Sequence, residues 1–390
     1  MKIAIPRERR SGEARVAASP DTVKKLVELG FEVAIENGAG TESSLPDAAF
    51  EAAGATIAAT AKMALSGADV VFKVQRPIVE AKEGGTNEVA LMKKGAVLIC
   101  LMAPHDDPSV AKACAAQGVT AFSMELLPRI TRAQSMDVLS SQSNLSGYRA
   151  VIDAASEFRR ALPLMMTAAG TVPPARVLVL GAGVAGLQAI ATAKRLGAIV
   201  SAFDVRPVAK EQVESLGASF VEVESEETED AETAGGYAKE MSEDYRKQQA
   251  QLVHETLKNT DIAICTALIP GKKAPVIITK AMAMDMKPGS VIVDLAVEQG
   301  GNVEGAKADQ VVVIDGVKII GFSNMAGRVA VDASALYARN LLNFLQPLVD
   351  AEAKKTALKL DWEDEILAAV VLTRDGKVVH PDFAKKGTKK

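Results

Sequence analysis

The 390-residue sequence is poor in the residues and runs that mark several protein classes. It has only three cysteines, Cys100, Cys114 and Cys265, and they form no CxxC pair. This excludes a disulfide framework and predicts buried, reduced thiols in a cytoplasmic protein. No apolar run approaches the roughly 18 uncharged residues of a membrane-spanning helix, and no signal peptide precedes the first strand-like segment. Any membrane role is therefore expected to run through a partner.

Aromatic residues make up only 4% of the chain, and there are three histidines. The low aromatic content predicts a core of Ala, Val, Leu and Ile. The formal net charge is −4 and no basic stripe accompanies aromatic side chains, which argues against nucleic acid as a main partner. No spacing typical of a metal site and no nucleophile motif occurs, so no metal is expected.

What the sequence does contain is a repeated alternation of strand-like and helix-like segments. A strand at residues 2–6 precedes a helix over 19–30, with Ser19 as N-cap, Pro20 in the first turn and Gly30 just past the end. Further apolar, strand-like runs follow at 31–36, 68–74, 96–102 and 119–125. Strands that alternate with helices predict a parallel sheet covered on both faces.

The alternation is interrupted by a polar, serine-rich segment that leads into a helix over about 146–161, expected to bridge two domains. A second series of strands begins at residue 175. After Gly327 a helical pattern returns the chain to the first domain, and residues 365–381 read as two strands around an Asp375-Gly376 turn. The acidic, then glycine-containing segment 222–240 is predicted to be a mobile surface loop.

These patterns predict an α/β protein with two doubly wound, parallel-sheet, Rossmann-like domains separated by a cleft. The length is too great for one ordinary core and suits two domains of typical size. The first domain is expected to be discontinuous, built from residues 1–145 and 328–390, and the second to span 146–327.

A glycine-rich turn lies at the start of the second strand series. Gly181, Gly183 and Gly186 follow an apolar strand and open an amphipathic helix. There they allow a tight turn, close approach of the backbone to a pyrophosphate, and close helix-to-strand packing. Asp204 ends the next strand, about 20 residues on, where a carboxylate can accept a hydrogen bond from a ribose 2′-hydroxyl. Because that carboxylate repels a 2′-phosphate, the site is expected to prefer NAD(H) over NADP(H), with Arg206 as a complication.

An enzyme that oxidises a small substrate alone needs proton-transfer groups beside the cofactor. Of the histidines, His105 alone could be a general acid or base, and the alternative is a solvated turn histidine. His254 and His380 are expected at the surface. Lys73 and Arg15 could bind a carboxylate substrate or could make structural ion pairs.

The densest polar cluster lies at residues 128–144, which we call the polar loop. Its side chains either cap the following helix within an interdomain linker or orient a carboxamide ring in the cleft. The residues concerned are Arg129, Arg132, Gln134, Asp137, Ser140 and Ser141.

Five segments together resemble a known family: the polar loop, residues 167–198 around the glycine turn, and residues 231–241, 266–271 and 289–302. They are similar to the NAD(H)-binding component, domain I, of proton-translocating nicotinamide nucleotide transhydrogenase. The resemblance covers nearly the whole chain, and the polar loop is its most specific segment. The family is related to alanine dehydrogenase, whose two-domain fold it shares.

The resemblance implies direct hydride transfer between NAD(H) held here and NADP(H) held by a separate component, coupled to proton movement through a membrane component. It also implies a homodimer at the cytoplasmic face of the membrane, reached only through partner subunits. Because the chain ends without membrane helices, it is expected to be a separate subunit.

The family's site residues carry over to matching positions. The nicotinamide ring is assigned to Arg129, Gln134, Asp137 and Ser140. Tyr237 corresponds to the tyrosine of a mobile loop that closes over bound nucleotide. The remaining dinucleotide contacts, beside the three glycines of the turn, are Val184, Asp204, Val205, Arg206, Gly236, Gln249 and Leu268.

Hydride transfer between two nicotinamides moves no substrate proton, so it needs positioning and exclusion of water more than an acid–base pair. The shortage of histidine agrees with this. In alanine dehydrogenases the matching strand carries a catalytic histidine where this chain has Met102, and Glu298 replaces an aspartate. Lys273 departs from the transhydrogenase pattern, which has proline there. Two alternatives stay open: a solitary alanine-dehydrogenase-like oxidoreductase, and a non-catalytic NAD(H)-responsive module whose polar loop serves only protein contact.

Overall fold

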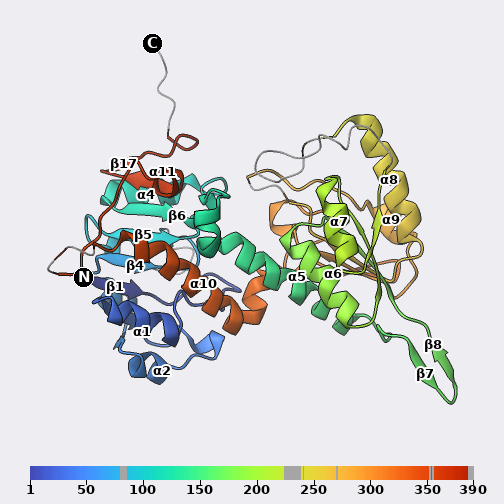
Figure 1. Cartoon of the computed structure of the whole chain (residues 1–390), viewed down its shortest axis with the longest axis horizontal. Coiled ribbons are helices and arrows are strands. Elements are labelled where there is room, and N and C mark those ends of the chain that lie inside the picture. Colours follow the sequence, from blue (N-terminus) through green and yellow to red (C-terminus); the bar gives the residue numbers. More distant parts are fainter. Residues whose placement is uncertain are drawn as a thin grey trace, which may run out of the picture. The chain divides into compact units, whose positions relative to one another are not determined.

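The computed structural model describes residues 1–79, 86–223, 239, 241–268, 271–350, 353 and 355–384. The chain forms two compact units (Figure 1). Unit 1 consists of Met1–Gln142 and Gly327–Lys390, and unit 2 of Ser143–Ala326. The predicted fold class is confirmed, because each unit contains a mostly parallel sheet and the first is built from both ends of the chain.

Unit 1 contains an eight-stranded sheet in the order β3-β2-β1-β4-β5-β6-β16-β17. From β3 to β6 the strands are parallel, and β16 and β17 add an antiparallel edge. The strands are β1 (Lys2–Ile5), β2 (Glu32–Glu36), β3 (Thr56–Ala58), β4 (Val70–Phe72), β5 (Val97–Cys100), β6 (Thr120–Ser123), β16 (Val371–Arg374) and β17 (Lys377–Val378). The helices are α1 (Pro20–Glu28), α2 (Asp47–Ala52), α3 (Ala61–Leu65), α4 (Pro108–Gln117), α10 (Ala330–Leu345) and α11 (Glu365–Val370).

Unit 2 contains a seven-stranded sheet in the order β11-β10-β9-β12-β13-β15-β14. All strands but the edge strand β14 are parallel. Numbered along the chain, the parallel strands follow the 3-2-1-4-5-6 order of dinucleotide-binding folds. They are β9 (Arg176–Leu180), β10 (Ile199–Phe203), β11 (Ser219–Val221), β12 (Ile262–Cys265), β13 (Val291–Asp294) and β15 (Val317–Ile320), with β14 at Val311–Ile314. The helices are α5 (Val138–Glu157), α6 (Val184–Arg195), α7 (Val208–Ser215), α8 (Glu243–Leu257) and α9 (Lys280–Met284). The first residues of α5, up to Gln142, belong to unit 1.

Both sheets are covered on both faces. In unit 1, Ile3 and Ile5 pack with α1 and α10 while Ala4 packs with α3 and α4, because successive side chains of a strand point to opposite faces. In unit 2, α5, α6 and α7 cover one face and α8 and α9 the other. The carboxyl ends of the strands are therefore the accessible places for a ligand.

Several local predictions are confirmed. Ser19 caps α1, Pro20 is its first residue and Gly30 follows its end. The hairpin around Asp375-Gly376 forms, with a φ of 52° and 74° at the two turn residues. The residues just before that hairpin were wrongly predicted as strand: Glu365–Val370 form α11, because Asp364 caps the backbone N–H groups of Ile366 and Leu367.

The helix predicted from about residue 146 begins instead at Val138 and ends at Glu157. Its serine-rich start reads as loop, but two serine hydroxyls there have partners: Ser140 bonds Asp137, and Ser141 bonds Asn340. The sequence patterns also missed β14 and a two-stranded hairpin, β7 (Met165–Thr167) and β8 (Gly170–Val172), that extends away from the rest of unit 2 (Figure 1). The predicted mobile loop at 222–240 lies almost wholly outside the described residues.

Candidate functional site

The glycine-rich turn connects β9 to α6 at the carboxyl edge of the unit 2 sheet. Gly181 has a φ of 101°, a conformation that side-chain-bearing residues rarely adopt. Gly183 is the N-cap of α6, so the positive end of the helix dipole faces the turn. Because β9 lies between β10 and β12, the turn sits where the strand order reverses, which is where open α/β sheets bind ligands.

The other two glycines have different local reasons. A Cβ on Gly186 would lie 1.9 Å from the carbonyl oxygen of Gly181, so only glycine permits this packing of helix on turn. A Cβ on Gly183 would meet nothing within 4 Å. The space above Gly183 is therefore open to a phosphate group, and the turn fits the pyrophosphate of a dinucleotide.

We expect these two positions to respond oppositely to alanine. Gly186→Ala should lower the free energy of unfolding of unit 2 by about 1–3 kcal/mol through overpacking. Gly183→Ala should leave stability unchanged, because its φ of −78° suits alanine, but should weaken NADH binding about tenfold, or about 1.4 kcal/mol. Calorimetry and NADH titration measure the two effects. If both variants lost stability alike, or affinity alike, the separate roles assigned to Gly186 in packing and to Gly183 in phosphate binding would be wrong.

Asp204 follows β10 and joins the same edge. Its Oδ2 accepts a hydrogen bond from the backbone N–H of Ala182 at 2.7 Å, which ties the end of β10 to the glycine turn. Its Oδ1 accepts from the backbone N–H and the Nε of Arg206, both at 2.9 Å, and Oδ2 from the Arg206 Nη2 at 2.8 Å. The carboxylate is thus buried and held in a fixed orientation.

The remaining predicted nucleotide residues come from three elements. Val184 is the first residue of α6 and is 39% exposed. Val205 follows β10 and is partly buried against the core that α8 covers, and Leu268 follows β12. Gln249 is half-buried on α8. Gly236 and Tyr237 lie outside the described residues.

Three residues that hold this edge together were not singled out from the sequence. The Thr266 hydroxyl donates to the carbonyl oxygen of Gly181 at 2.8 Å. Asn302, fully buried, donates to the carbonyl oxygens of Ala267 and Pro275, both at 2.8 Å. Buried Asp294 accepts from the backbone N–H of Val303, and burial raises its pKa. Two of them could have been found from the sequence, because Thr266 and Asp294 are polar residues at the end of otherwise apolar, strand-like runs.

The polar loop belongs to unit 1 and to the start of α5. Residues Thr131–Met136 form a short 3-10 helix, and Asp137 then caps α5. The Asp137 carboxylate accepts from the Ser140 N–H at 2.9 Å and from its hydroxyl at 2.5 Å. Arg129 and Gln134 are exposed. The four residues predicted to hold the nicotinamide therefore lie on one short segment.

The loop is fastened from α10 and α11. Asn340 and Asn343 each donate from Nδ2 to the carbonyl oxygen of Ser135 at 2.9 Å. Arg132 forms an ion pair with Asp364, with 2.6 Å between Nη1 and Oδ2. These contacts hold the backbone beside Gln134 and so position its side chain.

The structure resolves the open alternative for Lys73 and Arg15 in favour of ion pairs. The Lys73 ammonium is buried between Glu8, at 3.1 Å, and Glu88, at 3.2 Å. Burial alone would lower the pKa of Lys73, but the two carboxylates raise it overall. Arg15 bonds both carboxylate oxygens of Glu13, at 2.8 Å and 2.7 Å. Both cations are thus neutralised by the protein.

The histidines show no arrangement for acid–base catalysis. His105 is exposed and its ring contacts Phe383 edge-on at 4.7 Å. His254 forms a surface pair with Asp285 at 2.7 Å, whereas His380 is buried, against the surface position predicted for it. Met102 is buried, and Glu298 is exposed.

All three cysteines are buried. Among the described residues no cluster of three His, Cys, Asp or Glu side chains could hold a metal ion. Within the same portion of the chain, no helix combines the length and apolarity needed to cross a bilayer.

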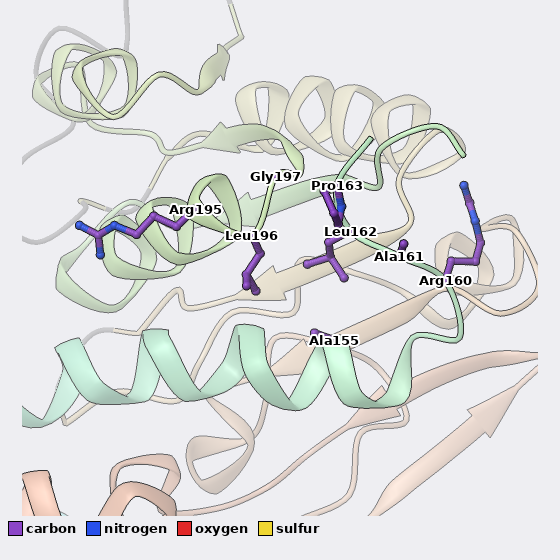
Figure 2. Close-up of a pocket in the computed structure, with 8 residues that line it drawn as sticks. All are labelled: Ala155, Arg160, Ala161, Leu162, Pro163, Arg195, Leu196 and Gly197. Atoms are coloured by element: carbon purple, nitrogen blue, oxygen red, sulfur yellow. The ribbon is translucent and has the colours of Figure 1, made fainter. Parts of the chain in front are cut away.

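A hollow of about 510 Å³ lies elsewhere on unit 2 (Figure 2). Leu162 precedes β9 and Gly197 precedes β10, which places the hollow at the amino edge of the sheet, opposite the glycine turn. It also adjoins the start of the β7–β8 hairpin through Pro163. Its walls are mainly apolar: Ala155, Arg160, Ala161, Leu162, Pro163, Arg195, Leu196 and Gly197. The hollow is thus separate from the glycine turn.

Two family models match the chain. The N-terminal domain of the alanine dehydrogenase/PNT family matches residues 4–146, and its C-terminal domain matches residues 150–381. The chain belongs to this family. Membership of the alanine dehydrogenase/PNT family implies NAD(H) binding through the C-terminal domain.

Known members of the family differ in how similar they are to this chain. The first portion of a divided NAD(P) transhydrogenase subunit alpha, from Rhodospirillum rubrum, is 62% identical over 387 residues, covering 99% of this chain and 100% of the relative. The crystal structure of transhydrogenase from Sinorhizobium meliloti has a TM-score of 0.87 and 52% identity, covering 97% of this chain and 100% of that one. Alanine dehydrogenase of Halomonas elongata is 32% identical over 393 residues, 99% of this chain and 96% of the relative.

Proposed function

We propose that this chain is the NAD(H)-binding subunit, the first portion of a divided subunit alpha, of a proton-translocating NAD(P) transhydrogenase. The observation that carries the proposal is the 62% identity, over the full length of both chains, to the Rhodospirillum rubrum protein of that kind. The reaction is direct hydride transfer between NAD(H) on this chain and NADP(H) on a partner subunit. Bound NAD(H) supplies the hydride-carrying nicotinamide.

The dinucleotide binds at the carboxyl edge of the unit 2 sheet. The open space at Gly183, the N-terminus of α6 and the carboxylate of Asp204 support this placement. Gly236 and Tyr237, outside the described residues, are included in the proposed site because of the family resemblance alone. The other contacts are Gly181, Gly186, Val184, Val205, Arg206, Gln249 and Leu268.

The polar loop orients the nicotinamide carboxamide through Arg129, Gln134, Asp137 and Ser140. Positioning suffices because hydride transfer between two nicotinamide rings abstracts no substrate proton. The neutralised cations Lys73 and Arg15, and the exposed His105 with its ring against Phe383, support a site without substrate acid–base groups.

The partners are an NADP(H)-binding subunit and a membrane component through which protons move. The Rhodospirillum rubrum relative is named as one portion of a divided subunit alpha, which supports the existence of further subunits. The chain works at the cytoplasmic face of the membrane and reaches it only through these partners.

The chain is also proposed to form a homodimer through the β7–β8 hairpin. Leu164, Met165 and Met166 are 57%, 45% and 83% exposed, an unusual apolar run for a surface. The mainly apolar hollow beside Pro163 offers a surface of matching character at the base of the same hairpin (Figure 2). A two-fold axis would let each copy receive the other's hairpin.

Met166→Ser should weaken this dimer. Burying a methionine side chain contributes about 1.5–3 kcal/mol, so the dimer dissociation constant should rise more than tenfold. Met63→Ser removes a methionine that is 58% exposed on α3 and serves as the matched control. Sedimentation velocity over a range of protein concentrations measures both. Unchanged association of the Met166 variant would exclude the hairpin from the interface.

The function is tested by supplying each candidate set of reactants. The transhydrogenase proposal expects hydride transfer with an NADP(H)-binding subunit and no turnover of pyruvate, ammonia and NADH by this chain alone. Turnover without a second protein would establish an alanine-dehydrogenase-like enzyme. Tight NADH binding with no transfer in a demonstrated complex would establish a nucleotide-responsive module.

A further inference from the structure

The ribose end of the candidate nucleotide site contains a cation as well as a carboxylate. An acidic residue at the end of the second strand accepts bonds from a ribose 2′-hydroxyl, and an arginine nearby accommodates a 2′-phosphate. This chain has both, two residues apart, as Asp204 and Arg206. The two features point to opposite nucleotides, so the contacts between them decide which one acts.

The Asp204 carboxylate binds the Arg206 guanidinium. Arg206 donates to Asp204 from Nε at 2.9 Å and from Nη2 at 2.8 Å, the two-bonded arrangement that orients an arginine most strictly. The backbone N–H of Arg206 adds a third bond at 2.9 Å. The side chains are 6% exposed for Asp204 and 15% for Arg206, so water screens this pair weakly.

The same carboxylate is also fully used as an acceptor. With the bond from Ala182, each of its oxygens accepts two hydrogen bonds, which matches the roughly four acceptor sites of a carboxylate. A ribose hydroxyl is a donor and can replace one guanidinium bond on Asp204. A 2′-phosphate has no hydrogen to donate at neutral pH and would meet the carboxylate as a like charge.

We propose that Asp204 and Arg206 form a selectivity pair, in which Asp204 masks a latent 2′-phosphate-binding arginine and so excludes NADP(H). This rests on the proposed NAD(H)-binding function and names the residues that keep the two nucleotides on separate subunits. Removing the carboxylate charge should release the Arg206 guanidinium from Asp204 and let the site accept a 2′-phosphate.

The test is a comparison of NADH and NADPH affinities by titration of the full chain. Two variants are used: Asp204→Asn, which keeps the shape and an acceptor for Ala182, and Asp204→Ser, which removes the pair altogether. In each we expect NADPH to bind at least tenfold more tightly than to the wild type, and NADH about tenfold more weakly. Circular dichroism and thermal melting identify a variant that fails to fold. Asparagine has the shape of aspartate, so the Asp204→Asn variant can be measured even if Asp204→Ser does not fold.

The decisive control is the addition of Arg206→Ser to each variant. If Arg206 is the latent phosphate-binding group, the gain in NADPH affinity should disappear in both double variants. A gain that persists without Arg206 would show that only carboxylate repulsion was removed and would overturn the proposal, as would the absence of any gain.

Failure of this inference can be told apart from failure of the proposed function. A wild-type chain that binds NADPH as tightly as NADH overturns the selectivity pair alone. A wild-type chain that binds neither nucleotide overturns both. A wild-type chain that binds NADH selectively, with the expected switch in the variants, supports the pair even if no hydride transfer is found.

Discussion

Gln134→Asn is expected to slow single-turnover hydride transfer about 100-fold while changing NADH affinity by no more than a few-fold. The substitution keeps the carboxamide but moves it back by one methylene group. A displacement of about 1 Å in a positioning group can cost about 100-fold in rate, because the reacting atoms no longer meet in line. Stopped-flow measurement of transfer, with a separate NADH titration, gives the two numbers.

The structure explains why the backbone cannot compensate for the shorter side chain. Asn340 and Asn343 hold the carbonyl oxygen of Ser135, the neighbour of Gln134, and Arg132 ties the loop to Asp364. Gln212→Asn, the same change at an exposed position on α7, should leave both numbers at wild-type values. Equal losses of rate and affinity in the Gln134 variant would show a binding role and sink the positioning argument.

Lys73→Met is expected to lower the free energy of unfolding of unit 1 by about 3–5 kcal/mol. The substitution leaves Glu8 and Glu88 buried without the ammonium that bonds both of them, and removing one partner of a buried ion pair has this order of cost. The chain has a single tryptophan, Trp362, packed against Phe122 in unit 1. Urea denaturation followed by tryptophan fluorescence therefore reports on unit 1.

A matched control separates burial from the loss of a lysine. Lys93→Met removes an exposed lysine of unit 1 that is paired with Asp69, and its urea midpoint should equal that of the wild type. If Lys73→Met unfolds at the same urea concentration as the wild type, the ion pairs of Lys73 with Glu8 and Glu88 do not stabilise the fold. Lys73 would then be available to a substrate carboxylate, and the solitary dehydrogenase would regain support.

Much of the fold follows from local patterns because their signals are short in range. The alternation of apolar strands and amphipathic helices predicted both sheets, and the Asp375-Gly376 pair predicted its hairpin. The start of α5 was misplaced because Ser140 and Ser141 favour loops unless their hydroxyls are bonded, and one of the bonding partners, Asn340, lies far along the chain.

The local geometry of the glycine turn could be predicted from the sequence, whereas the contacts of Lys73 and Asn302 could not. The spacing of the glycines predicts a tight turn, and the structure has a close contact between helix and turn at Gly186 and open space at Gly183. Their contacts with a nucleotide stay a prediction. The ion pairs of Lys73 could not be predicted from the sequence, because Glu8 and Glu88 come close to it only when the chain folds. Asn302 was missed for the same reason: its two carbonyl partners lie in another loop.

We propose that this chain supplies the NAD(H) side of a direct hydride transfer. The most direct measurement is a stopped-flow experiment with NADPH bound to a purified transhydrogenase NADP(H)-binding subunit and an NAD⁺ analogue, with and without this chain. We expect rapid reduction of the analogue only when the chain is present. No reduction, despite NADH binding and a demonstrated complex between the two proteins, would show that the chain is not the NAD(H) side of this reaction.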